Sequence, residues 1–108
     1  MRTLALLALM AVLSSGCVQV NRPMAAEEFK GFCYQWSGSR QASCDTISVC
    51  DAYDPVVNAR QPSLDKCLEE CQNIYGPQRQ QYMMRDCEGA AQNARDWCQR
   101  FCRDNYPK

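Results

Sequence analysis

The chain opens with an unbroken apolar run and then changes to the spacing of amphipathic helices. Residues 4–13 are all apolar, whereas from residue 23 onward apolar side chains recur at intervals of three and four. The ten apolar residues are about half the length that a membrane-spanning helix requires. With Arg2 before the run and small residues at positions 14–16 after it, the pattern is typical of a signal peptide. We therefore expect residues 1–16 to be removed on export.

Helical spacing first appears after residue 22. The first predicted helix opens at Asn21-Arg22-Pro23, because proline is favoured in the first turn, and ends at Ser37-Gly38-Ser39. Residues 37–62 are rich in Ser, Asp, Asn, Gly and Pro, so we expect a loop-rich middle with one short helix near residues 43–52. The expected buried stripe of the first helix consists of Phe29, Phe32, Cys33 and Trp36.

Two longer helices are expected after the loop-rich middle. One has Ser63 as its N-cap and ends at Gly76-Pro77, because proline cannot continue the hydrogen-bonded turn. The other lies within residues 78–105, where Gly89 should weaken the first turns by about 1 kcal/mol. Their expected apolar stripes are Leu64, Cys67, Leu68, Cys71, Ile74 and Tyr75, and then Met84, Cys87, Ala91, Ala94, Cys98, Phe101 and Cys102.

Two Cys-x-x-x-Cys pairs predict how these two helices face each other. The spacing places Cys67 and Cys71 on one side of a helix, one turn apart, and it does the same for Cys98 and Cys102. In an antiparallel pair, residues with the same index sum lie opposite each other. Pairing Cys67 with Cys102 and Cys71 with Cys98 satisfies one such sum and leaves residues 76 to about 85 as the loop.

A second register of the hairpin is an alternative. A tight turn at the Gly-Pro step would place Cys67 opposite Cys87. We favour the first register, in which Cys87 joins Cys33, Cys44 and Cys50 as a set whose pairing the spacing does not decide. We expect all eight of these cysteines to form disulfides.

Composition explains why disulfides are needed. From Cys17 onward, Leu, Ile, Val and Phe make up only 12 of 92 residues, a fraction that alone would suggest disorder. The same stretch holds all nine cysteines, which is typical of a small exported domain. We therefore expect residues 25–108 to form an all-α, disulfide-stapled domain, built from a helical hairpin, an N-terminal helix and the loop-rich middle.

The sequence Leu13-Ser14-Ser15-Gly16-Cys17 resembles the lipobox of bacterial lipoproteins. In that family small residues precede a cysteine that is acylated and becomes the new N-terminus; Ser14 stands where the family usually has leucine. Removing Cys17 from the nine cysteines leaves an even eight for disulfides. We expect lipidation of Cys17, with residues 17–24 as a lipidated cysteine and short tether. The alternative is ordinary cleavage after Gly16, which leaves a free thiol.

The same resemblance implies a location. In lipoproteins of two-membrane bacteria an aspartate after the cysteine tends to mark retention in the inner membrane, and here that residue is Val18. The resemblance thus implies the bacterial cell envelope, with the domain anchored to the outer membrane and facing the periplasm; the extracellular face is the alternative. The lipid bilayer is then one partner, through acylated Cys17.

The hairpin cysteines also have a resemblance of their own. Paired Cys-x-x-x-Cys turns on a helical hairpin resemble the α-hairpinin defence peptides and the small chaperones of the mitochondrial intermembrane space. The 26 residues between the two pairs exceed the usual spacing in both families. This resemblance implies shared geometry, and no functional residue is carried over from it.

Catalytic patterns are not evident in the sequence. Histidine is absent, which removes the usual general base near neutral pH. Ser43, Asp45, Asp51 and Asp54 form no nucleophile or acid–base pattern, and there is no Cys-x-x-Cys redox motif. We expect a protein that is not an enzyme and has no cofactor.

Metal binding is the sharper alternative for the cysteines. Cys-x-x-x-Cys with Met83 and Met84 nearby offers soft sulfur ligands that suit Cu(I). Export favours structural disulfides instead, because the compartment is oxidising. Alkylation without reductant distinguishes the two, since paired cysteines stay unlabelled.

Charge narrows the class of partner. Twelve basic and twelve acidic residues give a formal net charge of zero, so we expect no nucleic acid partner. Our expectation is a structural or accessory lipoprotein that acts through contact with an unidentified envelope protein. A copper- or thiol-handling module and a disulfide-rich, inhibitor-like binder are the alternatives.

Overall fold

The computed structural model describes residues 22–37, 44–83 and 87–108. Over these ranges the chain is all-α and contains no strand, so the predicted fold class is confirmed. The expected signal peptide, Cys17 and the tether up to residue 21 lie outside the described residues. The helices are α2 (Ala26–Tyr34), α3 (Thr46–Asp51), α4 (Asp54–Val57), α5 (Leu64–Tyr82) and α6 (Glu88–Asn105).

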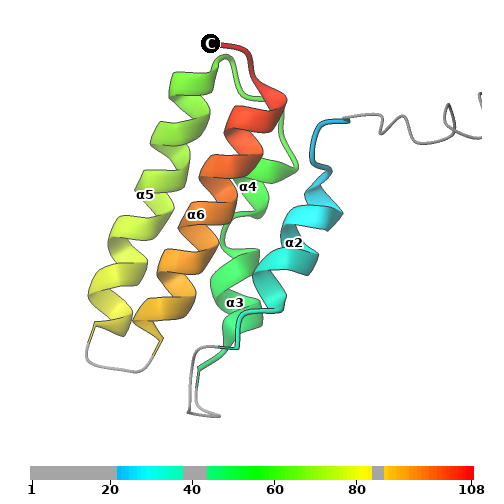
Figure 1. The fold of residues 1–108 in the computed structure, drawn as a ribbon. Helices are drawn as coiled ribbons and strands as arrows, with labels where there is room; N and C mark the ends of the chain where they lie inside the picture. The colour runs from blue at the N-terminus through cyan, green and yellow to red at the C-terminus, as the bar shows by residue number, and fades with distance from the viewer. Residues whose placement is uncertain (1–21, 38–43, 84–86) are drawn as a thin grey trace, which may run out of the picture.

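The helices form two layers (Figure 1). One is the hairpin of α5 and α6, and the other, the α2–α4 layer, consists of α2, α3 and α4. Helices α5 and α6 lie side by side and antiparallel as a long hairpin (Figure 1). Helices α2 and α3 pack against α6, and α4 contacts both α5 and α6. Helix α2 contacts both α3 and α6, so the N-terminal helix and the middle of the chain form one continuous packing unit on the hairpin.

Helix α5 continues through the Gly76-Pro77 step and ends at Tyr82, so the prediction of a helix end at that step is wrong. Proline there removes one hydrogen bond and crowds the carbonyl of Asn73, which costs about 3 kcal/mol. Packing on either side of the step compensates for this cost. Tyr75 and Gln78 are both buried, and the side-chain amide of Gln78 donates to the carbonyl of Val49 at 2.9 Å.

The starts of the helices follow local capping chemistry. Ser63 caps α5 as predicted, because its Oγ accepts from the backbone N–H of Lys66 at 3.1 Å. Helix α2 begins later than predicted, at Ala26, since the Glu28 carboxylate accepts from the backbone N–H of Ala25 at 3.1 Å and stabilises a start at that point.

The loop-rich middle holds more helix than the sequence predicts. Helix α3 lies within the expected range, and the Asp45 carboxylate caps it by accepting from the backbone N–H of Ser48 at 3.0 Å. Helix α4 was not predicted. This middle segment also supplies three fully or nearly fully buried core side chains, Val49, Tyr53 and Val56.

The core differs from the predicted stripes at one aromatic position. Phe29 and Cys33 are fully buried as predicted, but Phe32 is 40% exposed, so its assignment to the buried stripe is wrong. Phe32 lies where α2 meets α6, and its ring stacks on that of Trp97. On α6 the buried small residues Ala91 and Ala94 allow neighbouring helices to approach closely.

Gly89 has a packing role in the first turn of α6. A Cβ atom on this residue would lie 2.6 Å from Cζ2 of Trp36, well inside the contact distance of two carbon atoms. The glycine that is expected to weaken the helix therefore provides the space in which the Trp36 ring packs against α6.

Candidate functional site

Two disulfides join the helices of the hairpin. Cys67 is bonded to Cys102 and Cys71 to Cys98, which are the pairs of the register that we favoured, and Cys87 does not face Cys67. The bonds lie one helical turn apart, and the Sγ atoms of Cys71 and Cys102 are 3.4 Å from each other. Adjacent sulfurs thus form the centre of the α5–α6 contact, where larger aliphatic side chains would otherwise pack.

One of the other two disulfides lies within the α2–α4 layer, and the other joins this layer to the hairpin. Cys33 is bonded to Cys50 and joins α2 to α3, and Cys44 is bonded to Cys87 and joins the segment before α3 to the N-cap of α6. Tertiary structure thus decides the pairing that the sequence left open. Because every long helix is covalently linked to a neighbour, the domain presents its surface side chains on a rigid frame.

The positions of the sulfur atoms bear on the alternative of a Cu(I) site. Cys71, Cys98 and Cys102 place their sulfur atoms within 4.8 Å of one another. Each of the three belongs to a disulfide and has no thiolate to donate to a metal. Met83 lies at the far end of α5, roughly 18 Å along the helix from Cys71, and Met84 lies outside the described residues. The proposed copper ligands are therefore not brought together.

The acidic residues of the middle segment have structural partners. Lys30 Nζ lies 2.8 Å from the carboxylate of Asp54 and 3.6 Å from that of Asp51, and the hydroxyl of Tyr34 donates to Asp51. The hydrogen bond to Asp54 raises the pKa of Lys30, so the lysine stays charged and links α2 to α3 and α4. Asp45 is the cap of α3, and Ser43 lies outside the described residues.

A stacked aromatic pair lies where α2 meets α6. The rings of Phe32 and Trp97 are nearly parallel, with an interplanar angle of 11° and centroids 4.5 Å apart. The guanidinium of Arg100, one turn further along α6, lies over the Trp97 ring at 5.1 Å from its centroid. Phe32 and Arg100 are exposed and Trp97 is half-buried, so this aromatic stack is open to a partner.

Arg100 and the similar Arg95 differ in their ion pairs. Arg95 also lies over an aromatic ring, that of Tyr75, but it forms an ion pair with Asp96 at 3.0 Å. Among the residues that the structure describes, no carboxylate lies within ion-pair distance of Arg100. Within the described ranges, the aromatic stack therefore combines an exposed apolar surface with a cation that has no ion-pair partner.

The sequence did not identify this stack as a site. Helical spacing placed Phe32 in the buried stripe of its own helix, and the helical pattern of the last helix did not single out Trp97 or Arg100. Contact between α2 and α6 brings the three together, and no pairing signal for those two helices is present in the sequence.

Two buried polar atoms lie away from the aromatic stack. The hydroxyl of Tyr53 and Oε1 of Gln78 have no hydrogen-bond partner among the described residues. Burial raises the pKa of the Tyr53 hydroxyl, so this group stays neutral at physiological pH. Both atoms lie in the packing between the α2–α4 layer and the hairpin.

The described surface is hollowed at α5. One hollow of about 360 Å³ lies along the C-terminal half of α5. Its lining residues are Gln72, Tyr75, Gly76, Arg79, Gln80 and Met83.

No described helix combines the length and the apolar character needed to cross a membrane. No protein-family model matches the chain, and no curated protein or solved structure is significantly similar to it.

Proposed function

We propose that this protein is a lipid-anchored accessory component of a bacterial cell-envelope assembly, and that it acts through protein–protein contact. Acylated Cys17 holds it on the bilayer, and the aromatic stack of Phe32, Trp97 and Arg100 binds the partner. The observation that carries the proposal is the exposure of this stack on a frame that four disulfides make rigid.

The chemistry of the stack supports a protein partner. Tryptophan and arginine are enriched among the residues that dominate binding energy at protein interfaces. A rigid frame lowers the conformational entropy that is lost on binding. Because Arg100 has no ion pair among the described residues, the complementary surface carries a carboxylate beside an apolar group that covers Phe32.

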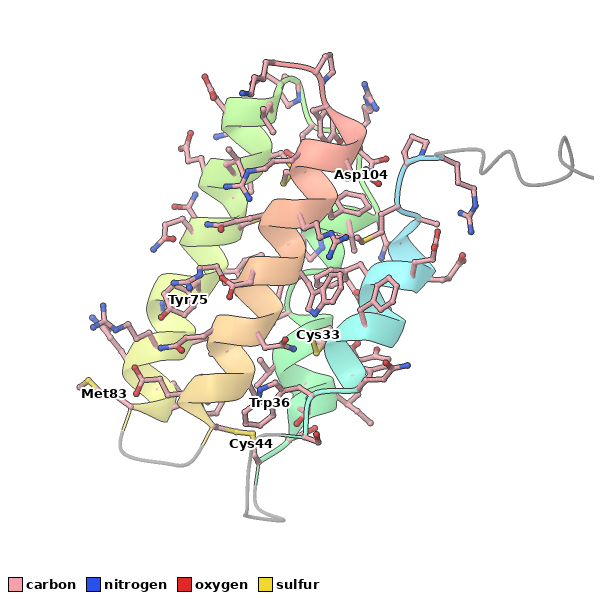
Figure 2. All side chains as sticks on the ribbon, viewed as in Figure 1. Cys33, Trp36, Cys44, Tyr75, Met83 and Asp104 are labelled. Atoms are coloured by element: carbon pink, nitrogen blue, oxygen red, sulfur yellow. A yellow bond between two sulfur atoms is a disulfide. The ribbon has the colours of Figure 1, made fainter. Side chains whose placement is uncertain are left out.

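The attachment of the N-terminal segment keeps the domain near its anchor. The backbone N–H of Met24 donates to the carboxylate of Asp104, and the Met24 carbonyl accepts from the side chain of Asn105 at 2.9 Å. These bonds tie the entry of the chain to the end of α6, near the Asp104 label in Figure 2. The chain from Cys17 to Met24 spans at most about 25 Å, so the domain works close to the bilayer.

Site-specific photocrosslinking in the native membrane tests the proposed surface. A benzophenone side chain at Phe32 should give one dominant protein adduct, whereas the same group at exposed Asn73, on α5, should not give it. Arg100→Glu should abolish the adduct, and Arg103→Glu, a neighbouring exposed arginine on α6, should leave it unchanged. Equal adducts from Phe32 and Asn73 would contradict the proposed surface.

The anchor is tested separately. Intact-mass measurement of the purified membrane form should show acyl chains on the mature N-terminus, and Cys17→Ser should release the protein from the membrane. An unacylated mature form with a free Cys17 thiol would contradict the anchor, whereas the crosslinking result would still report on the surface.

A further inference from the structure

The four disulfides differ in their access to solvent. The cysteines of Cys33–Cys50, Cys67–Cys102 and Cys71–Cys98 are all 0% exposed. In the fourth disulfide Cys87 is 3% exposed, and Cys44 is half-buried. Thiol–disulfide exchange requires a thiolate to reach a sulfur atom directly, so the four bonds differ in whether a reagent can approach them.

The two ends of the accessible bond also differ. Cys87 is the N-cap of α6, a helix of 18 residues, and the positive end of a long helix stabilises a thiolate at that position. A sulfur whose thiolate is stabilised in this way is a better leaving group in exchange. Attack at the more exposed Cys44, with departure of Cys87, is therefore favoured both by access and by the leaving group.

Opening this bond leaves the remaining framework intact. Cys33–Cys50 still holds α2 to α3, and the two hairpin disulfides still hold α5 to α6. The Cys44–Cys87 bond closes a separation of 43 residues and ties the start of α3 to the start of α6. Its loss changes the attachment between the two layers at one end of the molecule and does not remove either layer.

Trp36 lies at the same end of the molecule as Cys44 (Figure 2). Its ring packs against Gly89, which follows Cys87 by two residues in the first turn of α6. The environment of this indole depends on the position of the start of α6, so Trp36 reports on the state of the bond.

We propose that Cys44–Cys87 is a thiol–disulfide exchange site and that its reaction partner is a dithiol reductant. The class of protein that carries out this chemistry is an exported oxidoreductase in its reduced form. A thiolate of the reductant attacks Cys44 Sγ; the new S–S bond forms as the bond to Cys87 breaks, and Cys87 leaves as a thiolate that takes a proton from solvent. The second thiol of the reductant loses its proton and attacks its own sulfur in the mixed disulfide, which releases Cys44 as a thiolate that is then protonated. The protein gains two electrons and two protons, and the reductant becomes a disulfide.

Graded reduction of the exported protein tests the site. Dithiothreitol at increasing concentration, followed by iodoacetamide and peptide mapping, should label Cys44 and Cys87 at least about tenfold faster than Cys33 and Cys50, because buried bonds react only after local opening. Trp36 emission should change in the same step, while helical circular dichroism is retained. Equal labelling rates for the two bonds, or loss of all disulfides in one step, would overturn the proposal.

A monothiol tests the direction of attack. With glutathione followed by iodoacetamide, the glutathione adduct should be found on the Cys44 peptide and the alkyl group on the Cys87 peptide. The opposite distribution would show that Cys87 is the attacked sulfur and would overturn the assigned polarity. The variant carrying both Cys44→Ser and Cys87→Ser is the control, and it should keep its helical signal and bind no glutathione at its six remaining disulfide cysteines.

Discussion

The α5–α6 hairpin and the α2–α4 layer are stabilised in different ways. The hairpin consists of two helices of 19 and 18 residues, joined by two neighbouring disulfides. The layer consists of helices of 9, 6 and 4 residues with one internal disulfide, and it supplies the large core side chains Phe29 and Tyr53. Isolated helices this short are not stable in water. The layer therefore depends on packing against α6, whereas the hairpin depends on its sulfur bridges.

Removal of disulfides should show this difference most strongly. Cys33→Ala with Cys50→Ala should lower the free energy of unfolding by about 3 kcal/mol, because this is the one bond internal to the layer. Cys71→Ala with Cys98→Ala should lower it by roughly half as much, since Cys67–Cys102 still closes nearly the same loop. Urea unfolding under non-reducing conditions measures both, and the reverse order would contradict the comparison.

Replacement of the internal proline should strengthen the hairpin. Pro77→Ala restores a backbone hydrogen bond inside α5 and should raise the free energy of unfolding by about 1–3 kcal/mol. Urea unfolding measures the change, and Pro55→Ala, in the first turn of α4, is the control that should not stabilise. A loss of stability in Pro77→Ala would contradict this expectation, because it would show that the proline stabilises α5 through packing by more than the missing hydrogen bond costs.

Two glycines give opposite expectations for the same substitution. Gly89→Ala should lower the free energy of unfolding by about 1 kcal/mol, because the new methyl group collides with Trp36. Gly76→Ala should raise it by about 0.5–1 kcal/mol, because nothing lies within 4 Å of the added carbon and alanine is the better helix former. Thermal unfolding together with tryptophan emission compares them; similar values for both would contradict the close approach at Gly89.

The smallest expected effect is pH-dependent. Hydrogen bonds from Ser48 hold the pKa of Asp45 below its ordinary value. A lowered pKa contributes stability above the ordinary value, and this contribution is lost as the pH falls through the folded value. Asp45→Ala should therefore destabilise at pH 7 by less than Gly89→Ala does, with the difference from the wild type shrinking below about pH 4. Ser63→Ala, at the other cap, should show no such pH dependence in thermal unfolding.

Local chemistry explains which elements were predictable. Ser63 caps α5 because an N-cap depends on residues close in sequence, and the one-turn spacing of the cysteine pairs favoured the hairpin register that the disulfides confirm. The extension of α5 past Pro77 was not predictable, because contacts of Tyr75 and Gln78 with the rest of the domain outweigh the local preference. Contributions of that kind come from residues distant in sequence.

The aromatic stack illustrates the same limit for the site. Phe32 and Trp97 have core spacing within their own helices, yet Phe32 is exposed where it stacks on Trp97 between α2 and α6. Whether Arg100 has an ion pair likewise depends on which carboxylates other helices place beside it, and among the described residues none does so. Sequence spacing describes one helix at a time and contains neither fact.

The sequence by itself determined that the domain is helical and that cysteines replace aliphatic residues, and it favoured one of two registers for the two long helices. Helix periodicity and the one-turn spacing of the cysteines depend on local geometry, which is set by residues close in sequence. Only the tertiary structure decided the pairs Cys33–Cys50 and Cys44–Cys87, the space for Trp36 at Gly89, and the exposed aromatic stack. These features arise where short helices pack on α6, and contacts between distant segments depend on three-dimensional fit.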